Sequence, residues 1–223
     1  MKLPVLTLFI LIPLVSISQF YFRTTANLST VSDAESGPQL THPKSLWGAS
    51  LGIGGIFKAK KLTLLTEMNF TQKGFKIHET PNGFGFTVDE KLRLRLSYLE
   101  FPILAKLNLD KKNNRIYLAA GPYLAFALGG KYEYSYYENN QGTITQISHN
   151  GFSFDSDLVG YAGEDYTVKK KADFGLQFGL GYSVRPKTIL DLRYGIGLTK
   201  LSPDDPSEPK NRCFQIGLVF LGR

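Results

Sequence analysis

The feature that most constrains this chain is a strict alternation of large apolar residues with small or polar ones. From 172 to 184 the even positions hold Ala, Phe, Leu, Phe, Leu, Tyr and Val, and the odd positions hold Asp, Gly, Gln, Gly, Gly and Ser. A period of two residues is the period of a β-strand, in which neighbouring side chains point to opposite faces. The segment therefore predicts a strand with one apolar face and one face of small and polar groups.

Similar alternation occurs in seven further segments, so that eight strands are predicted. The strands are 20–29, 45–57, 62–75, 84–107, 115–132, 172–184, 188–198 and 214–220. In the fourth strand the apolar series runs on even positions as far as Tyr98 and continues on odd positions from Leu99. Two adjacent residues on one face imply a β-bulge at this point, and Pro102 just beyond it is tolerated best at a bulge or an edge.

The choice of which face lies inside decides the class of protein. In a soluble barrel, such as a lipocalin, the apolar rows of all eight strands would have to pack together in the interior. The interior of an eight-stranded barrel only just accommodates side chains, so rows as bulky as Phe174, Leu176 and Phe178 do not fit there. Apolar residues facing lipid and polar residues facing the lumen are typical of membrane barrels. The sequence therefore predicts an all-β protein, an eight-stranded antiparallel up-and-down transmembrane β-barrel.

Connection lengths give an independent indication of the same class. The gaps after the second, fourth and sixth strands are short, at 58–61, 108–114 and 185–187. The other gaps are longer, at 30–44, 76–91, 133–171 and 199–211. Short periplasmic turns that alternate with long outer loops are typical of outer-membrane barrels.

Two dipeptides in the long loops are those preferred in type I′ hairpin turns, Asn82-Gly83 and Asn150-Gly151. We expect the third and fourth strands to extend beyond the lipid and to meet at the first dipeptide. We expect loop 133–171 to hold its own hairpin around the second. A ten-stranded barrel that uses this hairpin is the alternative.

The N-terminus has the outline of a secretory signal. A basic start at Lys2 is followed by an apolar run from Leu3 to Val15 and by small residues at Ser16 and Ser18. The run is shorter than the roughly 20 residues that a spanning helix needs. We therefore expect residues 1–18 to be removed as a signal peptide, and residues 19–223 to form a barrel domain in the cell outer membrane.

Charged residues of both signs are expected to point into the barrel. Buried charges are costly unless they are paired, so we predict a salt-bridge network that plugs the lumen and disfavours a conducting pore. This predicted lumen network consists of Arg23, Glu67, Arg93, Arg95, Glu100, Lys106, Asp173, Asp191 and Arg193. A charged relay for transport is the alternative interpretation of the same residues.

The formal net charge of +7 does not indicate nucleic-acid binding, because the basic residues form no groove-like cluster and no nucleic-acid motif is present. Acidic residues gather in the long gaps and suit divalent cations that bridge lipopolysaccharide, whereas the basic short turns suit phospholipid headgroups. The expected partners are therefore outer-membrane lipids and lipopolysaccharide. Cys213 is the single cysteine, which excludes multi-cysteine metal sites. No cofactor and no metal site are expected.

Several segments together resemble the PorT-like outer-membrane β-barrel family of Bacteroidetes. The segments are 67–76, 97–107, 120–126, 171–182, 190–199 and 210–218. The most specific stretches are Tyr-Leu-Glu-Phe-Pro at 98–102 and Ala-Asp-Phe-Gly-Leu at 172–176. The resemblance spans about 67–220 and implies an eight-stranded barrel, with a role in type IX secretion known for PorT itself and no catalytic residues to transfer. Residues 215–220 also resemble the last-strand signal read by the barrel-assembly machinery, an expected partner during insertion.

The main functional hypothesis is a non-enzymatic barrel with a structural, loop-binding or type IX secretion-accessory role. Loop 133–171 is rich in tyrosine, which supplies contact area at low entropic cost, so this loop is the candidate site for a protein partner. An outer-membrane lipid-modifying enzyme that uses His42, His78 and His149 is one alternative, although their spacing gives no triad or metal signature. A secreted soluble barrel that binds a small ligand is the other.

Overall fold

The computed structural model consists of strands and their connections. It describes residues 16–32, 43–59, 62–79, 82–83, 86–110, 115–140, 143–152, 171–201 and 209–222. Within these ranges no helix is long and apolar enough to cross a membrane. Most of the predicted signal peptide, 1–15, lies outside the described residues, and residues 16–18 continue the first strand, so its removal stays a prediction.

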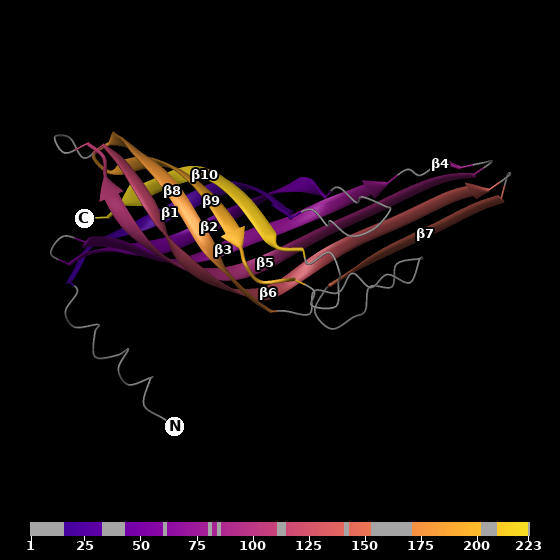
Figure 1. The fold of residues 1–223 in the computed structure, drawn as a ribbon, viewed down its shortest axis with the longest axis horizontal. Helices are drawn as coiled ribbons and strands as arrows, with labels where there is room; N and C mark the ends of the chain where they lie inside the picture. Colours follow the sequence, from indigo (N-terminus) through magenta and orange to yellow (C-terminus); the bar gives the residue numbers. More distant parts are fainter. Residues whose placement is uncertain are drawn as a thin grey trace, which may run out of the picture.

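Ten strands follow one another along the chain (Figure 1). They are β1 (Ser16–Val31), β2 (Lys44–Ala59), β3 (Leu62–Glu79), β4 (Asn82–Gly83), β5 (Phe86–Asn108), β6 (Ile116–Asn140), β7 (Thr143–Phe152), β8 (Ala172–Arg185), β9 (Thr188–Gly197) and β10 (Asn211–Leu221).

Eight of these strands close into a barrel. Antiparallel pairing runs in the order β5-β3-β2-β1-β10-β9-β8-β6, and β5 pairs with β6 to complete the ring. The two remaining strands stand outside the ring: β4 pairs with β5, and β7 pairs with the part of β6 that continues beyond β8. The predicted eight-stranded antiparallel barrel is therefore confirmed, and the ten-stranded alternative is wrong.

The apolar rows face outward, as predicted. Along β8, Phe174 and Phe178 are 47% and 46% exposed, whereas Asp173 and Gln177, which directly precede them, are each 1% exposed. The outward rows of the other barrel strands are apolar as well, with members such as Ile53, Phe70 and Leu218 exposed. A closed ring leaves no unpaired strand edge in hydrocarbon, and an apolar exterior matches the lipid tails.

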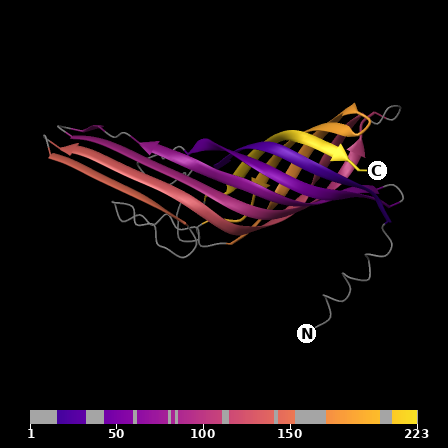
Figure 2. The ribbon, with the colours of Figure 1, turned by 180° about the vertical axis from the view of Figure 1, so that it is seen from behind.

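Three strands continue well beyond the ring. The β5 strand has 23 residues and β6 has 25, whereas a tilted strand crosses a bilayer in about ten. Figure 2 shows the far ends of β3, β5, β6 and β7 running on together as a sheet that projects from one end of the barrel. We call this part, residues 72–79, 86–97 and 129–140 with β7, the outer sheet.

The inner face of the outer sheet has its own hydrophobic cluster. Phe75 and Ile77 of β3, Leu94 of β5 and Tyr134 of β6 are buried there together with Val31 and Leu201. This cluster lies above the barrel mouth, where water replaces lipid. Burial of apolar side chains on one face is what gives a projecting sheet stability of its own.

The bulge predicted in the fourth strand at Tyr98 is not there. Even positions of β5 stay on the inner face from Leu92 through Tyr98 to Leu104. A register shift does occur at this level, but it lies on the partner strand: Ser97 is opposite Gly129 and Tyr98 is opposite Ala127, which leaves Leu128 as the extra residue. The backbone of β5 thus alternates regularly throughout, and its apolar residues move from the inner face to the outer face because they move from even to odd positions.

Neither Asn-Gly dipeptide forms the turn predicted for it. Asn82 and Gly83 pair with Thr87 and Phe86. Asn150 and Gly151 likewise pair with Glu133 and Tyr132 within a β6–β7 hairpin. In the first case the register is set closer to the barrel, where Phe75 is opposite Leu94 in the apolar cluster, and in that register Asn82 and Gly83 are paired strand residues.

We predict that Phe178→Arg prevents stable insertion, because this side chain lies in the outward row near the middle of β8. An arginine at the membrane midplane costs about 2–4 kcal/mol on the lipid face of a barrel. The measurement is equilibrium unfolding in urea with the protein in phospholipid vesicles, and Phe178→Leu is the matched control. Equal stability of the two variants would contradict the lipid-facing assignment.

Candidate functional site

The barrel interior holds two layers of charged side chains, and Arg193 of β9 is the centre of the first. Its guanidinium donates to both carboxylate oxygens of Glu67, with Nη2–Oε1 at 2.6 Å and Nη1–Oε2 at 2.8 Å. Its Nε lies 2.8 Å from Oδ2 of Asp191. This two-pronged geometry is the strongest form of an Arg–carboxylate pair and fixes both partners in place.

Arg23 of β1 completes the first layer. Its Nε lies 2.7 Å from Asp191 Oδ2, and its Nη2 donates to Oε1 of Gln215 at 2.9 Å. Two tyrosines close the layer: the Tyr21 hydroxyl donates to Glu67 at 2.6 Å and the Tyr117 hydroxyl donates to Asp191 at 3.3 Å. Two guanidinium groups and two carboxylates therefore neutralise one another within a shell of polar donors.

Glycines in the opposing strands make room for the two tyrosine rings. A Cβ atom on Gly54 would lie 2.4 Å from the ring of Tyr21, and one on Gly181 would lie 2.1 Å from the ring of Tyr117. Real Cβ contacts are essentially never this short, so any other residue would displace the ring. The pairing of glycine with tyrosine explains why small residues recur on the inner face.

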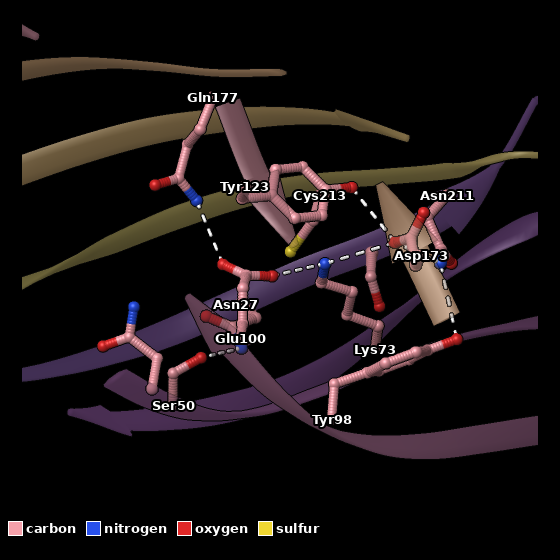
Figure 3. A network of polar contacts seen from close by, with 12 residues as sticks. Asn27, Ser50, Lys73, Tyr98, Glu100, Tyr123, Asp173, Gln177, Asn211 and Cys213 are labelled. Carbon is pink, nitrogen blue, oxygen red and sulfur yellow. Dashed lines mark hydrogen bonds and ion pairs between the residues drawn. The ribbon is translucent and has the colours of Figure 1, made fainter. Parts of the chain in front are cut away.

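Lys73 of β3 is the centre of the second layer (Figure 3). Its Nζ lies 2.5 Å from Glu100 Oε2 and 3.7 Å from Asp173 Oδ2. The same ammonium lies over the rings of Tyr123, at 4.5 Å from the centroid, and Tyr98, at 5.4 Å. A buried lysine thus has two carboxylates and two aromatic faces around it, which compensates for its loss of water.

Amide side chains fasten this second layer to its surroundings. Asp173 Oδ2 accepts hydrogen bonds from the Tyr123 hydroxyl at 3.1 Å and from Asn211 Nδ2 at 2.9 Å. Gln177 joins the two layers, since its Nε2 donates to Glu100 at 3.3 Å and its Oε1 accepts from Arg193 at 3.2 Å. The polar interior is therefore one connected network rather than two separate sites.

Most residues of the predicted lumen network lie in these layers. Six of them form the buried network with Lys73, namely Arg23, Glu67, Glu100, Asp173, Asp191 and Arg193. Lys106 points inward near the periplasmic end of β5, half-buried, with its Nζ 4.2 Å from the ring centroid of Tyr117. It joins no ion pair among the described residues.

Arg93 and Arg95 do not lie in the lumen, contrary to the prediction. Both are exposed on the outward face of the outer sheet, where Arg93 pairs with Glu133 at 3.0 Å. The error follows from the bulge that was expected at Tyr98. Because β5 keeps its phase, the odd positions face outward from Lys91 to Leu107.

Lys73 is the residue that the sequence reasoning missed. Its odd number places it on the same face of β3 as Glu67, Asn69 and Thr71, all of which are buried in the interior. The tyrosines were missed for a similar reason, since Tyr21 shares the phase of Arg23. The periodicity already placed these side chains inside, and following it strictly would have found them.

The histidines do not form a catalytic group in the described part of the chain. His78 lies on the outward face of the outer sheet, where its Nε2 is 2.9 Å from Asp89. That carboxylate also accepts a hydrogen bond from Lys91 at 2.6 Å, and this bond holds the pKa of Asp89 below its usual value. His42 and the side chain of His149 lie outside the described residues. Among the residues that the structure describes, no group of three or more His, Cys, Asp or Glu residues is arranged to hold a metal ion.

A closed eight-stranded ring with an apolar exterior and a charged, hydrogen-bonded interior defines a transmembrane β-barrel. The chain belongs to the outer membrane protein beta-barrel domain family, whose model matches residues 19–202. The protein is accordingly a protein of the cell outer membrane. No curated protein matches the sequence.

Three solved structures follow a similar course of the chain. The attachment invasion locus protein Ail of Yersinia pestis is 11% identical over 93% of this chain and all of its own, with a TM-score of 0.44. CarO of Acinetobacter baumannii is 11% identical over 90% of this chain and 97% of its own, with a TM-score of 0.41. Neisserial surface protein A is 16% identical over 91% and 95%, with a TM-score of 0.33.

We predict that Arg193→Ala destabilises the folded barrel by about 3–5 kcal/mol, because it leaves Glu67 buried without its cation. The matched control is Arg93→Ala, which breaks an exposed Arg–Glu pair of similar length and costs about 1 kcal/mol or less. Urea unfolding in vesicles measures both. Similar losses for the two variants would contradict the burial of the interior network.

Proposed function

We propose that this chain is a closed, non-enzymatic outer-membrane barrel that does not conduct and that acts through its outer sheet. The observation that carries the proposal is the connected network of buried charges across the barrel interior. Arg23, Lys73, Glu100, Asp191 and Arg193 are all buried, and each is engaged in an ion pair. Eight strands leave an interior that side chains of this size fill. A rigid plug of this kind is unsuited to passing solutes.

The outer sheet supports the second half of the proposal. Closing the barrel does not require strands of 23 and 25 residues, because about ten residues cross the membrane. The extra length builds a projecting sheet with its own hydrophobic cluster. A stable surface held above the membrane is suited to a structural or binding role, and loop 133–171 contributes residues 133–140 of β6 and all of β7 to it.

The secretion-accessory role rests on the resemblance to the PorT-like family of Bacteroidetes. The stretches that carry it lie in the barrel: Tyr98 to Pro102 contains the buried Glu100, and 172–176 contains the buried Asp173. The resemblance is thus strongest at the second charged layer. We propose that the barrel serves as a stable outer-membrane anchor for a protein partner of the type IX secretion machinery at the outer sheet.

We predict that the wild-type protein shows no steady single-channel current in a planar lipid bilayer. The matched variant is Glu67→Ser with Arg193→Ser. It removes both partners of a buried ion pair together, so that neither charge is left uncompensated, and Asp191 stays bound to Arg23. This variant shortens two large side chains in the first layer and is expected to admit ions. Steady current through the wild-type barrel would contradict the closed lumen.

We predict that shortening the outer sheet abolishes secretion of type IX cargo while the barrel still inserts. Replacing residues 77–92 with Asn-Gly joins Lys76 to Arg93, which lie directly opposite each other, through a two-residue turn. Cargo in the culture medium is measured in the parent bacterium lacking the chromosomal copy. The interior double variant, Glu67→Ser with Arg193→Ser, is the control and is expected to restore secretion. Loss of secretion in the control alone would overturn the role of the outer sheet.

A further inference from the structure

The outward face of the outer sheet and the adjoining end of β2 carry a cluster of cations. Lys44 of β2 lies directly opposite Lys76 of β3, and Lys76 lies directly opposite Arg93 of β5. One step closer to the membrane, Arg95 of β5 lies opposite Lys131 of β6. All five side chains are exposed. We call these five residues the basic face.

Carboxylates on this part of the sheet neutralise only some of the positive charge. Glu133 pairs with Arg93, and Asp89 is shared by His78 and Lys91. Within the described part of the chain, Lys44, Lys76 and Arg95 have no carboxylate within 4.0 Å. Like charges directly opposite each other destabilise a sheet, so this arrangement costs stability unless an anion lies between them.

The position of the basic face points to the membrane surface. Below it, the same outward side of β5 carries apolar Leu99, Phe101 and Ile103, which belong to the lipid-facing row. Arg95 is four residues beyond Leu99, about 13 Å along a strand and about 10 Å along the membrane normal at the usual tilt. Within this distance the outward row of β5 changes from apolar to charged, which is the change expected where the hydrocarbon ends and the polar headgroup layer begins.

Trp47 marks the same boundary on the neighbouring strand. Its side chain is 64% exposed on the outward side of β2, three residues after Lys44 and closer to the membrane. Tryptophan prefers the interface between hydrocarbon and headgroups. The basic face therefore begins where the phosphate groups of the outer leaflet are expected, and not at the height of a soluble partner far above the membrane.

We propose that the basic face binds the phosphate groups of the glycolipid that forms the outer leaflet, with Lys44, Lys76 and Arg95 as the principal contacts. Lipid A presents two phosphates on one headgroup, and paired rows of cations match a doubly anionic ligand. Lysine and arginine form charge-assisted hydrogen bonds to phosphate oxygens. Bound glycolipid would relieve the repulsion between Lys44 and Lys76 and would hold the outer sheet against the membrane.

The test is native mass spectrometry of the folded protein in detergent, with bis-phosphorylated lipid A as the probe. We expect the triple variant Lys44→Gln, Lys76→Gln and Arg95→Gln to lower the fraction of lipid-bound protein by about tenfold or more at a fixed lipid concentration. The matched control carries Lys58→Gln, Arg115→Gln and Arg185→Gln, an equal loss of charge at the exposed periplasmic end, and is expected to bind as the wild type does.

Two further probes test whether the phosphate groups are what the basic face recognises and whether the ligand is a lipid rather than a soluble polyanion. Enzymatically dephosphorylated lipid A is expected to bind the wild type as weakly as the triple variant binds lipid A. A soluble heparin fragment is expected not to displace bound lipid A at equal charge concentration. Equal binding of the dephosphorylated lipid, an equal loss in the periplasmic control, or heparin binding in place of lipid A would each overturn the proposal. Faster migration of the folded barrel on an unheated gel verifies that each variant is folded.

Discussion

The antiparallel pairing of β5 with β6 connects all the other features of this molecule. Over the membrane-spanning part it closes the ring, so that no strand edge is left open in hydrocarbon, where an unmade backbone hydrogen bond is very costly. The same pairing continues without interruption of the strands to Phe86 and Asn140 at the far end. One ladder of hydrogen bonds therefore makes the barrel and also carries the outer sheet, which is why the projecting part needs no hinge or linker.

Closure also determines what the interior must contain. Eight strands enclose a space that is only as wide as facing side chains, so a charged group that enters it leaves water behind. Arg193 can be accommodated because Glu67 accepts hydrogen bonds from two of its nitrogens and Asp191 lies 2.8 Å from its Nε. Lys73 can be accommodated because Glu100 and two tyrosine rings surround its ammonium. Breaking such pairs costs much more than the pairs contribute as a unit. The network consequently specifies one arrangement of strands around it and, at the same time, occupies the path that a solute would take.

The strand periodicity was sufficient to predict the ring, its eight members, the outward apolar rows and six residues of the buried network. It failed where one pattern admits two physical explanations. The move of the apolar series at Tyr98 was interpreted as a bulge in β5, and Arg93 and Arg95 were placed in the lumen for that reason. The turns were misplaced because the local preference of Asn-Gly for a type I′ turn is worth less than the register fixed by Phe75 and Leu94. Lys73 was missed because the inward phase of β3, which Glu67, Asn69 and Thr71 share, was not followed as far as residue 73.

The change of face at Tyr98 has a different cause, which is the change of solvent along the strand. Below this level lipid surrounds the barrel, and the apolar side chains Leu99, Phe101 and Ile103 turn outward. Above it water surrounds the sheet, and Leu92, Leu94 and Leu96 turn inward to form a core. The partner strand β6 makes the same inversion with a true bulge, since Leu128 faces out and Tyr134 faces in although both have even numbers. A change in the face that carries the apolar residues of a long strand can therefore indicate the membrane surface. When the apolar residues move from even to odd positions, as in β5, the strand needs no bulge. When they stay on even positions, as in β6, a bulge must turn them to the other face.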